Sequence, residues 1–297
     1  MRSVAFRKRL FTEYDLEGIL LVTNIIKKLY ICIRDFFSPM GFWGSYVSFP
    51  CKMRLRKLGI GSDYYKKIEE IKGKYNGGRC FIIATGPSLT IRDVSLLKKE
   101  ITIGENSIFK IYDQLGWVPT YYVMTDPTLT RKIINNNKGI VFDDFAVEKC
   151  IFNSLNIKDI NCKKGIFVDC NWLDHVYHYG ESRKFKFNDD LKYGVYDCYS
   201  VTQECIIYAM YMGFSEIYIL GADNDYLGKK QHFASYGGET SIEYDKALKM
   251  QKANDLGYEF VKSIADSKNI KIFNATRGGN INCFARVNLD EIIADRN

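Results

Sequence analysis

Short apolar runs alternate with longer helix-like segments from about residue 78 onward. Continuous apolar runs that end in turn residues are typical of buried strands. These runs predict strands at residues 80–85, 101–106, 120–126, 139–142, 165–168, 216–220 and 270–273. Helices are expected at residues 107–115, 128–136, 200–212 and 241–267. Strands that alternate with helices predict right-handed crossovers and a mostly parallel α/β sheet with helices on both faces.

The first part of the chain has a different pattern. Residues 16–37 fit an amphipathic helix with a basic side, and Lys27, Lys28, Arg34 and Asp35 make it too charged to span a membrane. Aromatic residues then lie beside Lys and Arg, a combination that suits the interface of an anionic membrane. The alternative is a helical extension packed on the body or on a second subunit. We therefore expect an N-terminal extension over residues 1–75 and one Rossmann-like nucleotide-sugar-binding domain over 76–297.

Composition supports this division. The 297 residues are 46% hydrophobic, which is enough for one large α/β domain with an appendage. Residues 1–67 contain 13 Lys and Arg against 5 Asp and Glu, so the net charge of +7 belongs to the extension and not to the body. The nine cysteines form no Cys-x-x-Cys pair and follow no secretory signal, which indicates reduced thiols in the cytoplasm. No zinc site is expected, because the chain has only three histidines and no metal-ligand spacing, and the basic extension is not expected to bind nucleic acid.

Polar and small residues follow the predicted strands. In an open parallel sheet, ligands bind beyond the carboxyl ends of the strands. The candidate donor-binding residues at these ends, with two at the start of the helix after residue 199, are Thr85, Gly86, Pro87, Ser88, Asn106, Asp126, Ser200, Thr202, Gly221, Ala222, Asn274 and Thr276. Helix caps and turns enrich the same residue types. We interpret the cluster as a binding cleft.

The turn after the first strand is the centre of this prediction. Gly86 lets the backbone turn sharply and lets a ligand approach closely. Pro87 suits the first turn of a helix, and Ser88 would offer its hydroxyl and N–H groups to an anion at that helix start. The alternative is an ordinary strand-to-helix turn with no ligand.

Other side chains suit specific parts of a nucleotide-linked ligand. Asn106 and Asp126 could bond a ribose or a base edge, while Tyr226 and Tyr236 could donate hydroxyl hydrogen bonds to a leaving phosphate. His232 lies in a polar loop after a strand end, and an imidazole with a pKa near 6.5 suits a general base. The alternative for His232 is a surface histidine.

One short motif suggests a metal. Asp223-Asn224-Asp225 matches the Asp-x-Asp pattern by which many glycosyltransferases bind a metal–diphosphate. Asp223 and Asp225 would then hold Mg²⁺ or Mn²⁺ with nucleotide oxygens. We expect no cofactor and keep this metal site as the alternative.

Several motifs, taken in order, resemble the MptE-like proteins, a family named for archaeal hydroxymethylpterin pyrophosphokinase. The motifs occupy residues 83–88, 104–106, 122–127, 200–202, 212–223, 232–233 and 274–279. Many bacterial members are thought to build surface polysaccharides or to glycosylate flagellin. The same order is similar to the Campylobacter-type sialyltransferases of glycosyltransferase family 42, over about residues 78–290. This resemblance implies the GT-A-like variant of the Rossmann-like fold.

The resemblance also implies roles for individual residues. It gives Gly86 to Ser88 a contact with the CMP part of a donor, although Thr85 replaces the Asn of the sialyltransferases. Asn106 matches the family, Asp126 stands where the family has Asn, and Ser200 and Thr202 match approximately. For catalysis, the resemblance implies Asp223 and Tyr226 at the strand end and His232 as the base, at a shorter spacing than in the family.

These features predict a glycosyltransferase at the inner face of a bacterial membrane. It would move sialic acid or a related nonulosonate from a CMP-sugar to a glycan, lipid-linked or part of a surface polysaccharide, and could form a homo-oligomer. One alternative is an Mg²⁺-dependent pyrophosphokinase that transfers from ATP to a pterin-like alcohol. Another is a non-catalytic nucleotide-binding protein of an assembly complex.

Overall fold

The computed structural model describes residues 42–60, 63–137, 140–171, 185–227 and 243–294. Its main element is an eight-stranded parallel sheet with the order β10-β9-β8-β1-β2-β3-β4-β5. The strands are β1 Arg79–Ile83, β2 Thr102–Glu105, β3 Tyr121–Met124, β4 Lys149–Asn153, β5 Gly165–Val168, β8 Glu216–Leu220, β9 Lys271–Asn274 and β10 Ala285–Arg286. Two short strands, β6 Cys170–Asn171 and β7 Val195–Tyr196, pair separately. The predicted mostly parallel α/β fold is confirmed.

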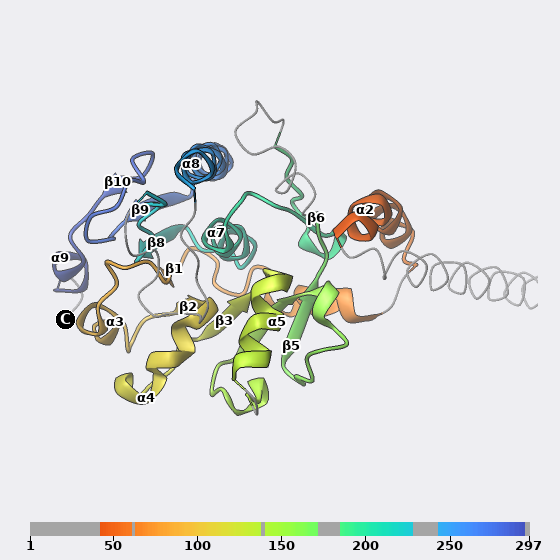
Figure 1. The fold of residues 1–297 in the computed structure, drawn as a ribbon, viewed down its shortest axis with the longest axis horizontal. Helices are drawn as coiled ribbons and strands as arrows, with labels where there is room; N and C mark the ends of the chain where they lie inside the picture. The colour runs from red at the N-terminus through yellow and green to blue at the C-terminus, as the bar shows by residue number, and fades with distance from the viewer. Residues whose placement is uncertain (1–41, 61–62, 138–139, 172–184, 228–242, 295–297) are drawn as a thin grey trace, which may run out of the picture.

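Helices cover both faces of this sheet (Figure 1). They are α2 Phe42–Lys57, α3 Ile91–Ser95, α4 Tyr112–Leu115, α5 Pro127–Asn136, α7 Val201–Tyr211, α8 Tyr244–Ser267 and α9 Leu289–Ala294. Short 3-10 segments are η2 Asp63–Ile71, η3 Asn106–Ile111, η4 Phe142–Asp144, η5 Ser154–Asn156 and η6 Leu191–Tyr193. Successive side chains of a strand point to opposite faces. Cys80 and Ile82 therefore pack with α7 and α8, whereas Phe81 and Ile83 pack with α3, α5 and α9.

The strand predicted at residues 139–142 is wrong. Phe142–Asp144 forms a 3-10 turn, and the strand lies later, at Lys149–Asn153. Phe142 is nevertheless buried, because it reaches the core from the turn and packs on Phe152 with ring centroids 5.0 Å apart. An apolar run shows that residues are buried, but a run this short does not identify the element that buries them.

The described part of the extension packs on the sheet domain. The Arg56 side chain of α2 is buried and forms an ion pair with Asp169, which follows β5. Tyr64 also donates a hydrogen bond of 3.2 Å to Asp169. Burial alone would raise the pKa of Asp169, but the charges of Arg56 and Lys52 outweigh it and hold that pKa well below its usual range. The amphipathic helix predicted at residues 16–37 lies outside the described residues.

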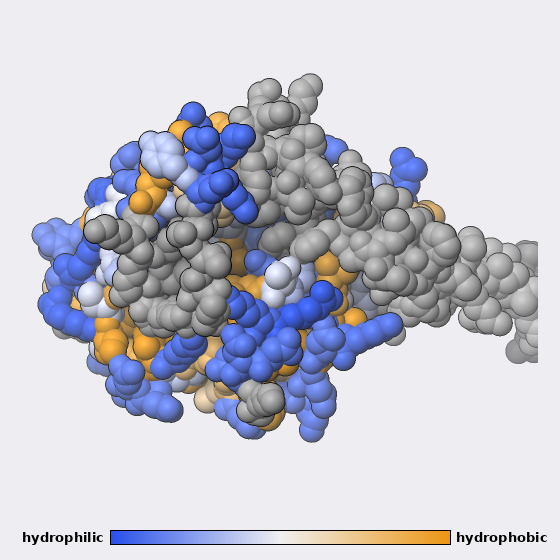
Figure 2. Space-filling model, in the orientation of Figure 1, coloured by the Kyte–Doolittle hydropathy of each residue, from blue (hydrophilic) through white to orange (hydrophobic). Residues whose placement is uncertain are grey.

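The helices, the surface and the cysteines bear on the predicted membrane contact and on the predicted reduced thiols. Within the described ranges, each helix is too short or too polar to cross a bilayer. The visible surface carries many hydrophilic residues with apolar groups between them (Figure 2). The described cysteines are free thiols, and six of the eight are buried.

Candidate functional site

The candidate site lies where the strand order reverses. From β1 the chain adds strands on one side as far as β5, and β8 then returns to the other side of β1. Such a switch point is where open α/β sheets bind ligands. The two strands continue side by side past their ends, since Ala84 N donates to Leu220 O at 2.9 Å and Gly86 N donates to Gly221 O at 2.7 Å.

This close approach explains the glycines at the two strand ends. A Cβ atom on Gly86 would lie 2.5 Å from the Gly221 carbonyl oxygen and closer still to the Asp223 carboxylate. Gly221 has a φ of +65°, a left-handed conformation that glycine adopts without strain. The sequence predicted a sharp turn at Gly86, and the close contact here is with the protein's own backbone and carboxylate.

Ser88 and Asp223 join the two strand ends. The N–H and hydroxyl groups of Ser88 both donate to Asp223 Oδ2, at 3.1 and 2.9 Å. The helix predicted to start at Pro87 and Ser88 begins later, at Ile91, with Thr90 as its N-cap. Ser88 is therefore part of the turn, and its two donors bind a carboxylate of the neighbouring strand end.

The residues after β8, 223 to 226, form a segment that we call the strand-end segment. Its first residue is fixed by the loop after β9, because Asn280 N donates to Asp223 O at 2.7 Å. Gly279 allows this approach, since a Cβ there would lie 2.7 Å from Asp223 Cα. Asn224 has a left-handed φ of +50° and donates to Asp255 of α8 at 2.6 Å. The backbone of the strand-end segment is thus held by the loop after β9 and by α8.

Tyr226, the predicted phosphate-binding tyrosine, also contacts α8. Asn254 Nδ2 donates to the Tyr226 hydroxyl oxygen at 3.2 Å. Further along, Tyr258 and Ser200 have hydroxyl oxygens 3.4 Å apart, which connects α8 with the start of α7. One face of α8 thus contacts both the strand-end segment and the start of α7. The sequence did not predict that α8 takes part in the site.

The predicted residues after β9 bind the loop itself. Thr276 Oγ1 accepts from Ala222 N at 3.2 Å, and Thr276 N donates to Asn274 Oδ1 at 3.0 Å. Asn274 Nδ2 donates to Ile281 O at 3.0 Å. Both side chains are buried and fix the β9 loop beside the strand-end segment. Direct donor binding by Asn274 and Thr276 stays a prediction.

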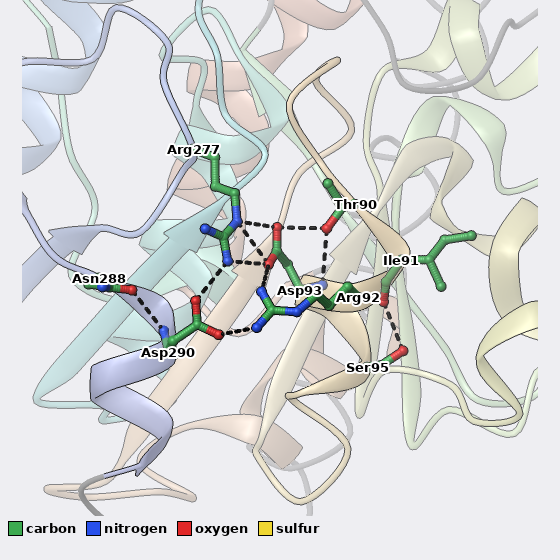
Figure 3. Close-up of polar contacts among 8 residues, drawn as sticks. All are labelled: Thr90, Ile91, Arg92, Asp93, Ser95, Arg277, Asn288 and Asp290. Atoms are coloured by element: carbon green, nitrogen blue, oxygen red, sulfur yellow. Dashed lines mark hydrogen bonds and ion pairs between the residues drawn. The ribbon is translucent and has the colours of Figure 1, made fainter.

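Next to this loop lies an ion-pair network that sequence reasoning also missed (Figure 3). Arg277 donates to both carboxylate oxygens of Asp93 at 2.7 to 2.9 Å and to Asp290 at 3.0 Å. Arg92 donates to the other oxygen of Asp290 at 2.8 Å. The network fastens the β9 loop to α3 and α9. The Arg277-Gly278-Gly279 stretch, directly after Thr276, was the available sequence signal.

The second half of the site is built on β2 and the start of α7. Thr202 Oγ1 donates to Glu105 Oε1 at 3.1 Å, and Cys205 contacts the other oxygen at 3.7 Å. Burial raises the pKa of Glu105 to about 8, although these two hydrogen bonds oppose it. Thr202, a predicted donor-binding residue, therefore donates its hydroxyl hydrogen bond to a buried acid of β2.

A second buried acid lies beside it on α7. Glu204 accepts from the Tyr208 hydroxyl at 3.2 Å, but its Oε1 is buried with no hydrogen-bond partner in the structure. Burial, and then the charge of Asp197, raise the pKa of Glu204 to about 8. The sequence placed Glu105 in the motif at residues 104–106 but predicted the burial of neither acid, because a glutamate within a strand or a helix gives no signal that it is buried.

Three predicted residues near this half have local backbone roles. Asp126 caps α5 by accepting from Thr128 N and Leu129 N at 2.8 and 2.9 Å, and Ser200 caps α7. Asn106 has a φ of +50°, and its Oδ1 is buried without a partner in the structure. Thr85 is buried at the end of β1. The predicted His232 and Tyr236 lie outside the described residues.

The residues do not fit a metal–diphosphate site well. Mg²⁺ requires near-octahedral oxygen ligands. Of the two carboxylates in the Asp-x-Asp pattern, Asp223 already accepts two hydrogen bonds from Ser88 on one oxygen, which a cation would have to share. Elsewhere in the described part of the chain, no group of three His, Cys, Asp or Glu side chains could hold a metal ion.

Comparisons with solved structures place the chain beside two weak structural neighbours. A structure of the MAf glycosyltransferase from Magnetospirillum magneticum AMB-1 has 14% identity and a TM-score of 0.47 over 80% of this chain and 40% of that one. The chain thus spans about two fifths of the length of that protein. The sialyltransferase CstII from Campylobacter jejuni, in complex with CMP-3FNeuAc, has 15% identity and a TM-score of 0.35 over 71% of this chain and 86% of that one.

Sequence comparisons identify the family. A search of curated proteins found no match. Residues 60–229 match the family described as 6-hydroxymethylpterin diphosphokinase MptE-like. These residues include β1 to β8, the Ser88–Asp223 contact and the strand-end segment. Since the match covers more than half of the chain, this protein belongs to the MptE-like family.

Proposed function

We propose that the protein is a glycosyltransferase that binds a nucleotide sugar at the β1–β8 switch point. The preferred donor is a CMP-linked sialic acid or a related nonulosonate, and the acceptor is a glycan. The resemblance of the ordered motifs to family 42 sialyltransferases supports this choice. The contacts that join the ends of β1, β8 and β9 with α7 and α8 support one continuous site.

The observation that carries the proposal is the Ser88–Asp223 contact. The rival pyrophosphokinase would need Mg²⁺, which Asp223 and Asp225 of the Asp-x-Asp pattern would hold. Both hydrogen bonds from Ser88 end on Asp223 Oδ2, so this carboxylate is used to join two strand ends. In the proposal Asp223 positions the site, and no metal takes part.

The proposed reaction breaks the bond between the donor sugar and its phosphate. His232 removes the proton of the acceptor hydroxyl, whose oxygen forms the new bond to the sugar carbon. The electron pair of the broken C–O bond leaves with the phosphate. Tyr226 donates a hydrogen bond to that phosphate and stabilises the charge that develops on it.

A thermal-shift panel of CMP, CDP, UDP, GDP and ATP, each with and without Mg²⁺, tests the ligand class. A ligand at about 100 times its Kd stabilises the fold by roughly 2.7 kcal/mol. We expect CMP or CDP to stabilise the protein without metal. Stabilisation only by ATP with Mg²⁺ would favour the pyrophosphokinase and restore a metal role for Asp223 and Asp225.

His232→Ala separates an enzyme from a non-catalytic nucleotide-binding protein. A general base contributes about 10²- to 10⁴-fold, so the variant should lose most turnover of a CMP-sugar while its CMP affinity stays unchanged. Tyr236→Phe is a second variant in the same stretch, which removes a proposed phosphate-binding hydroxyl and leaves His232 in place. Full turnover in His232→Ala would exclude this base, and absence of turnover in the unmodified protein would favour the assembly-protein alternative.

We also propose that the extension contacts an anionic membrane. Arg54 and Lys57 are exposed on α2, whereas Arg56 is buried against Asp169. The vesicle test therefore changes Arg54 and Lys57 to Glu and leaves Arg56 intact. Binding to vesicles that contain phosphatidylglycerol should weaken. Unchanged binding would favour an extension that only packs on the body or on a second subunit.

A further inference from the structure

Two cysteines lie together at one edge of the sheet, far from the switch point. Cys150 is the second residue of β4, and Cys162 lies in the loop that leads into β5. Both are buried in the apolar layer that also contains Phe152 and Phe167. Within the described residues, β5 is the last strand of the sheet and pairs with β4 alone. The two cysteines therefore lie across the pairing that holds this edge strand.

The backbone brings Cys162 to a position opposite Cys150. A turn closed by the hydrogen bond from Gly165 N to Cys162 O, at 3.1 Å, folds the loop back beside the start of β5. Gly165 is the residue that pairs with Cys150 in the register of β4 and β5. A Cβ atom on Gly165 would lie 3.3 Å from the Cβ atom of Cys162. Cys162 thus occupies the space of the side chain that Gly165 lacks, across from Cys150.

The two thiols contact each other. The Cys150 thiol donates a hydrogen bond to the Cys162 sulfur, which lowers the pKa of Cys162, whereas the same contact and burial raise the pKa of Cys150. Phe142 O is a second acceptor, 3.9 Å from Cys150 Sγ, and it also favours the protonated form of Cys150. Neighbouring strands lie about 4.8 Å apart, close to the separation of about 3.5–4.5 Å between the Cβ atoms of a disulfide.

Two charged residues face this pair. Asp143 of η4 accepts from Lys163 N at 2.8 Å and also contacts the Cys162 thiol, which by itself would raise the pKa of Cys162. The backbone N–H of Lys164 acts in the opposite direction, and the hydrogen bond from Cys150 outweighs both burial and Asp143. A thiolate is the reactive form of cysteine. Cys162, which is also the more exposed of the two, is therefore the sulfur that reacts first.

We propose that Cys150 and Cys162 form a redox site, in which a peroxide oxidises Cys162 and Cys150 then closes a reversible disulfide between β4 and the loop before β5. The inference is independent of the proposed glycosyl transfer. The disulfide would fasten the edge strand covalently to its neighbour, and a thiol reductant would release it.

The chemistry takes two steps. The Cys162 thiolate attacks one oxygen of hydrogen peroxide, which forms a sulfenic acid on Cys162 and releases hydroxide. The Cys150 sulfur then displaces the hydroxyl group of that sulfenic acid, so the S–S bond forms and the thiol proton leaves with the hydroxyl group as water. The hydroxide of the first step takes up the proton that Cys162 lost. Two thiols are oxidised, and one peroxide is reduced to two water molecules.

Peptide mapping of the folded full-length protein after treatment with hydrogen peroxide tests the site. We expect a linked Cys150–Cys162 peptide that dithiothreitol removes. Cys283 is the internal control, because it is more exposed than Cys162 but burial raises its pKa to about 11. Cys162 should be oxidised at least about 10-fold faster than Cys283. Oxidation of Cys162 without a linked peptide, or faster oxidation of Cys283, would overturn the proposal.

Cys150→Ser and Cys162→Ser separate the two roles. Cys150→Ser should stop at a sulfenic acid on Cys162, which dimedone traps, whereas Cys162→Ser should leave the fully buried Cys150 unoxidised. Cys283→Ser is the matched control and should still form the linked peptide. Oxidation of Cys150 in Cys162→Ser would contradict the assigned order.

The unfolding temperature gives a second readout on the unmodified protein. A disulfide restricts the unfolded chain, so the oxidised protein should unfold at a higher temperature than the reduced one, and dithiothreitol should abolish the difference. Peroxide should produce no such rise in Cys150→Ser. An equal rise in that variant would show that peroxide acts elsewhere and would overturn the proposal.

Discussion

The two halves of the sheet edge satisfy their buried polar groups in different ways. On β1, β8 and β9, the polar side chains bind one another or the backbone, as Ser88 binds Asp223 and Thr276 binds Ala222 N. On β2 and α7, two buried acids have pKa values raised to about 8, and Glu204 Oε1 lacks a partner in the structure. The first half has a fixed geometry, whereas the second contains groups that burial destabilises.

This difference indicates a division of work. Paired polar groups are rigid, and in the proposed reaction they would hold the phosphate of the donor without reorganisation. Buried neutral acids make the second half sensitive to proton concentration. Substitutions in the first half should therefore act through geometry, and substitutions in the second half through charge.

Gly86→Ala should have the largest effect, because it breaks the geometry of the first half. The new Cβ would overlap the Gly221 carbonyl and the Asp223 carboxylate, so the two strand ends must separate. We expect the free energy of unfolding to fall by about 3 kcal/mol or more, measured by urea denaturation. Gly278→Ala is the control, since its Cβ would meet no atom within 4 Å and only its φ of +97° is strained. Equal losses would show that the strand ends tolerate separation.

The second prediction concerns charge in the other half. Glu105 and Glu204 have folded pKa values raised to about 8 from the model-compound value of 4.5. A group with a raised folded pKa contributes stability below its unfolded pKa and loses it as pH rises through the folded pKa. Unfolding free energy should therefore decrease between about pH 4.5 and 8, the interval between these two pKa values.

Glu204→Gln should reduce that decrease to the part that Glu105 contributes, since an amide keeps the polar contact without ionising. We expect it to stabilise the protein by about 2 kcal/mol at pH 8.5 and to have little effect at pH 5, where Glu204 is neutral. Glu216→Gln is the control, because Glu216 also accepts from a tyrosine hydroxyl at 3.2 Å but is only half-buried. A steep pH slope that survives in Glu204→Gln would assign the effect to other groups.

Arg277→Ala should have a smaller effect and sharpens the view of the first half. It leaves the buried Asp93 without its bidentate partner, although Thr90 still donates to it at 2.7 Å. Because Arg277 is 43% exposed, we expect a loss of about 1–2 kcal/mol in urea denaturation. Arg131→Ala, which removes an exposed ion pair with Asp159, should change stability by less than about 0.5 kcal/mol.

Ser88→Ala should have the smallest effect. It removes the hydroxyl bond to Asp223 but keeps the N–H bond at 3.1 Å, so the loss should be about 0.5–1.5 kcal/mol. Turnover should remain measurable if Asp223 only positions the strand ends. Ser95→Ala, which removes an exposed hydroxyl bond to Ile91 O, serves as the control. A loss of all turnover in a folded Ser88→Ala would give this hydroxyl a direct role.

Much of the fold could be predicted from the sequence. Glu216–Leu220 was predicted to the residue, and most other strands to within two residues, because parallel strands that are buried on both faces leave continuous apolar runs. The strand at Lys149–Asn153 was missed, since its apolar core of three residues is as short as the run at 140–142. Local patterns do not show which of two short runs finds a partner in the sheet.

The candidate site was predictable only in part. The strand-end rule correctly brought Ser88 and Asp223 into one place, because it follows from the topology of parallel sheets. It could not show that they bind each other and not a ligand. The contacts of Asn254 and Arg277 join residues far apart in the sequence, and those pairings depend on how helices pack against the sheet.

The ion pair between Arg56 and Asp169 has a consequence for where the folding unit begins. The family match starts at residue 60, four residues after Arg56. A chain shortened to that point would lose both Arg56 and Lys52, the cations that hold the pKa of Asp169 below its usual range. The stretch that matches the family thus begins after the residues of α2 that stabilise Asp169, and we expect a chain that starts at residue 60 to be less stable than one that keeps α2.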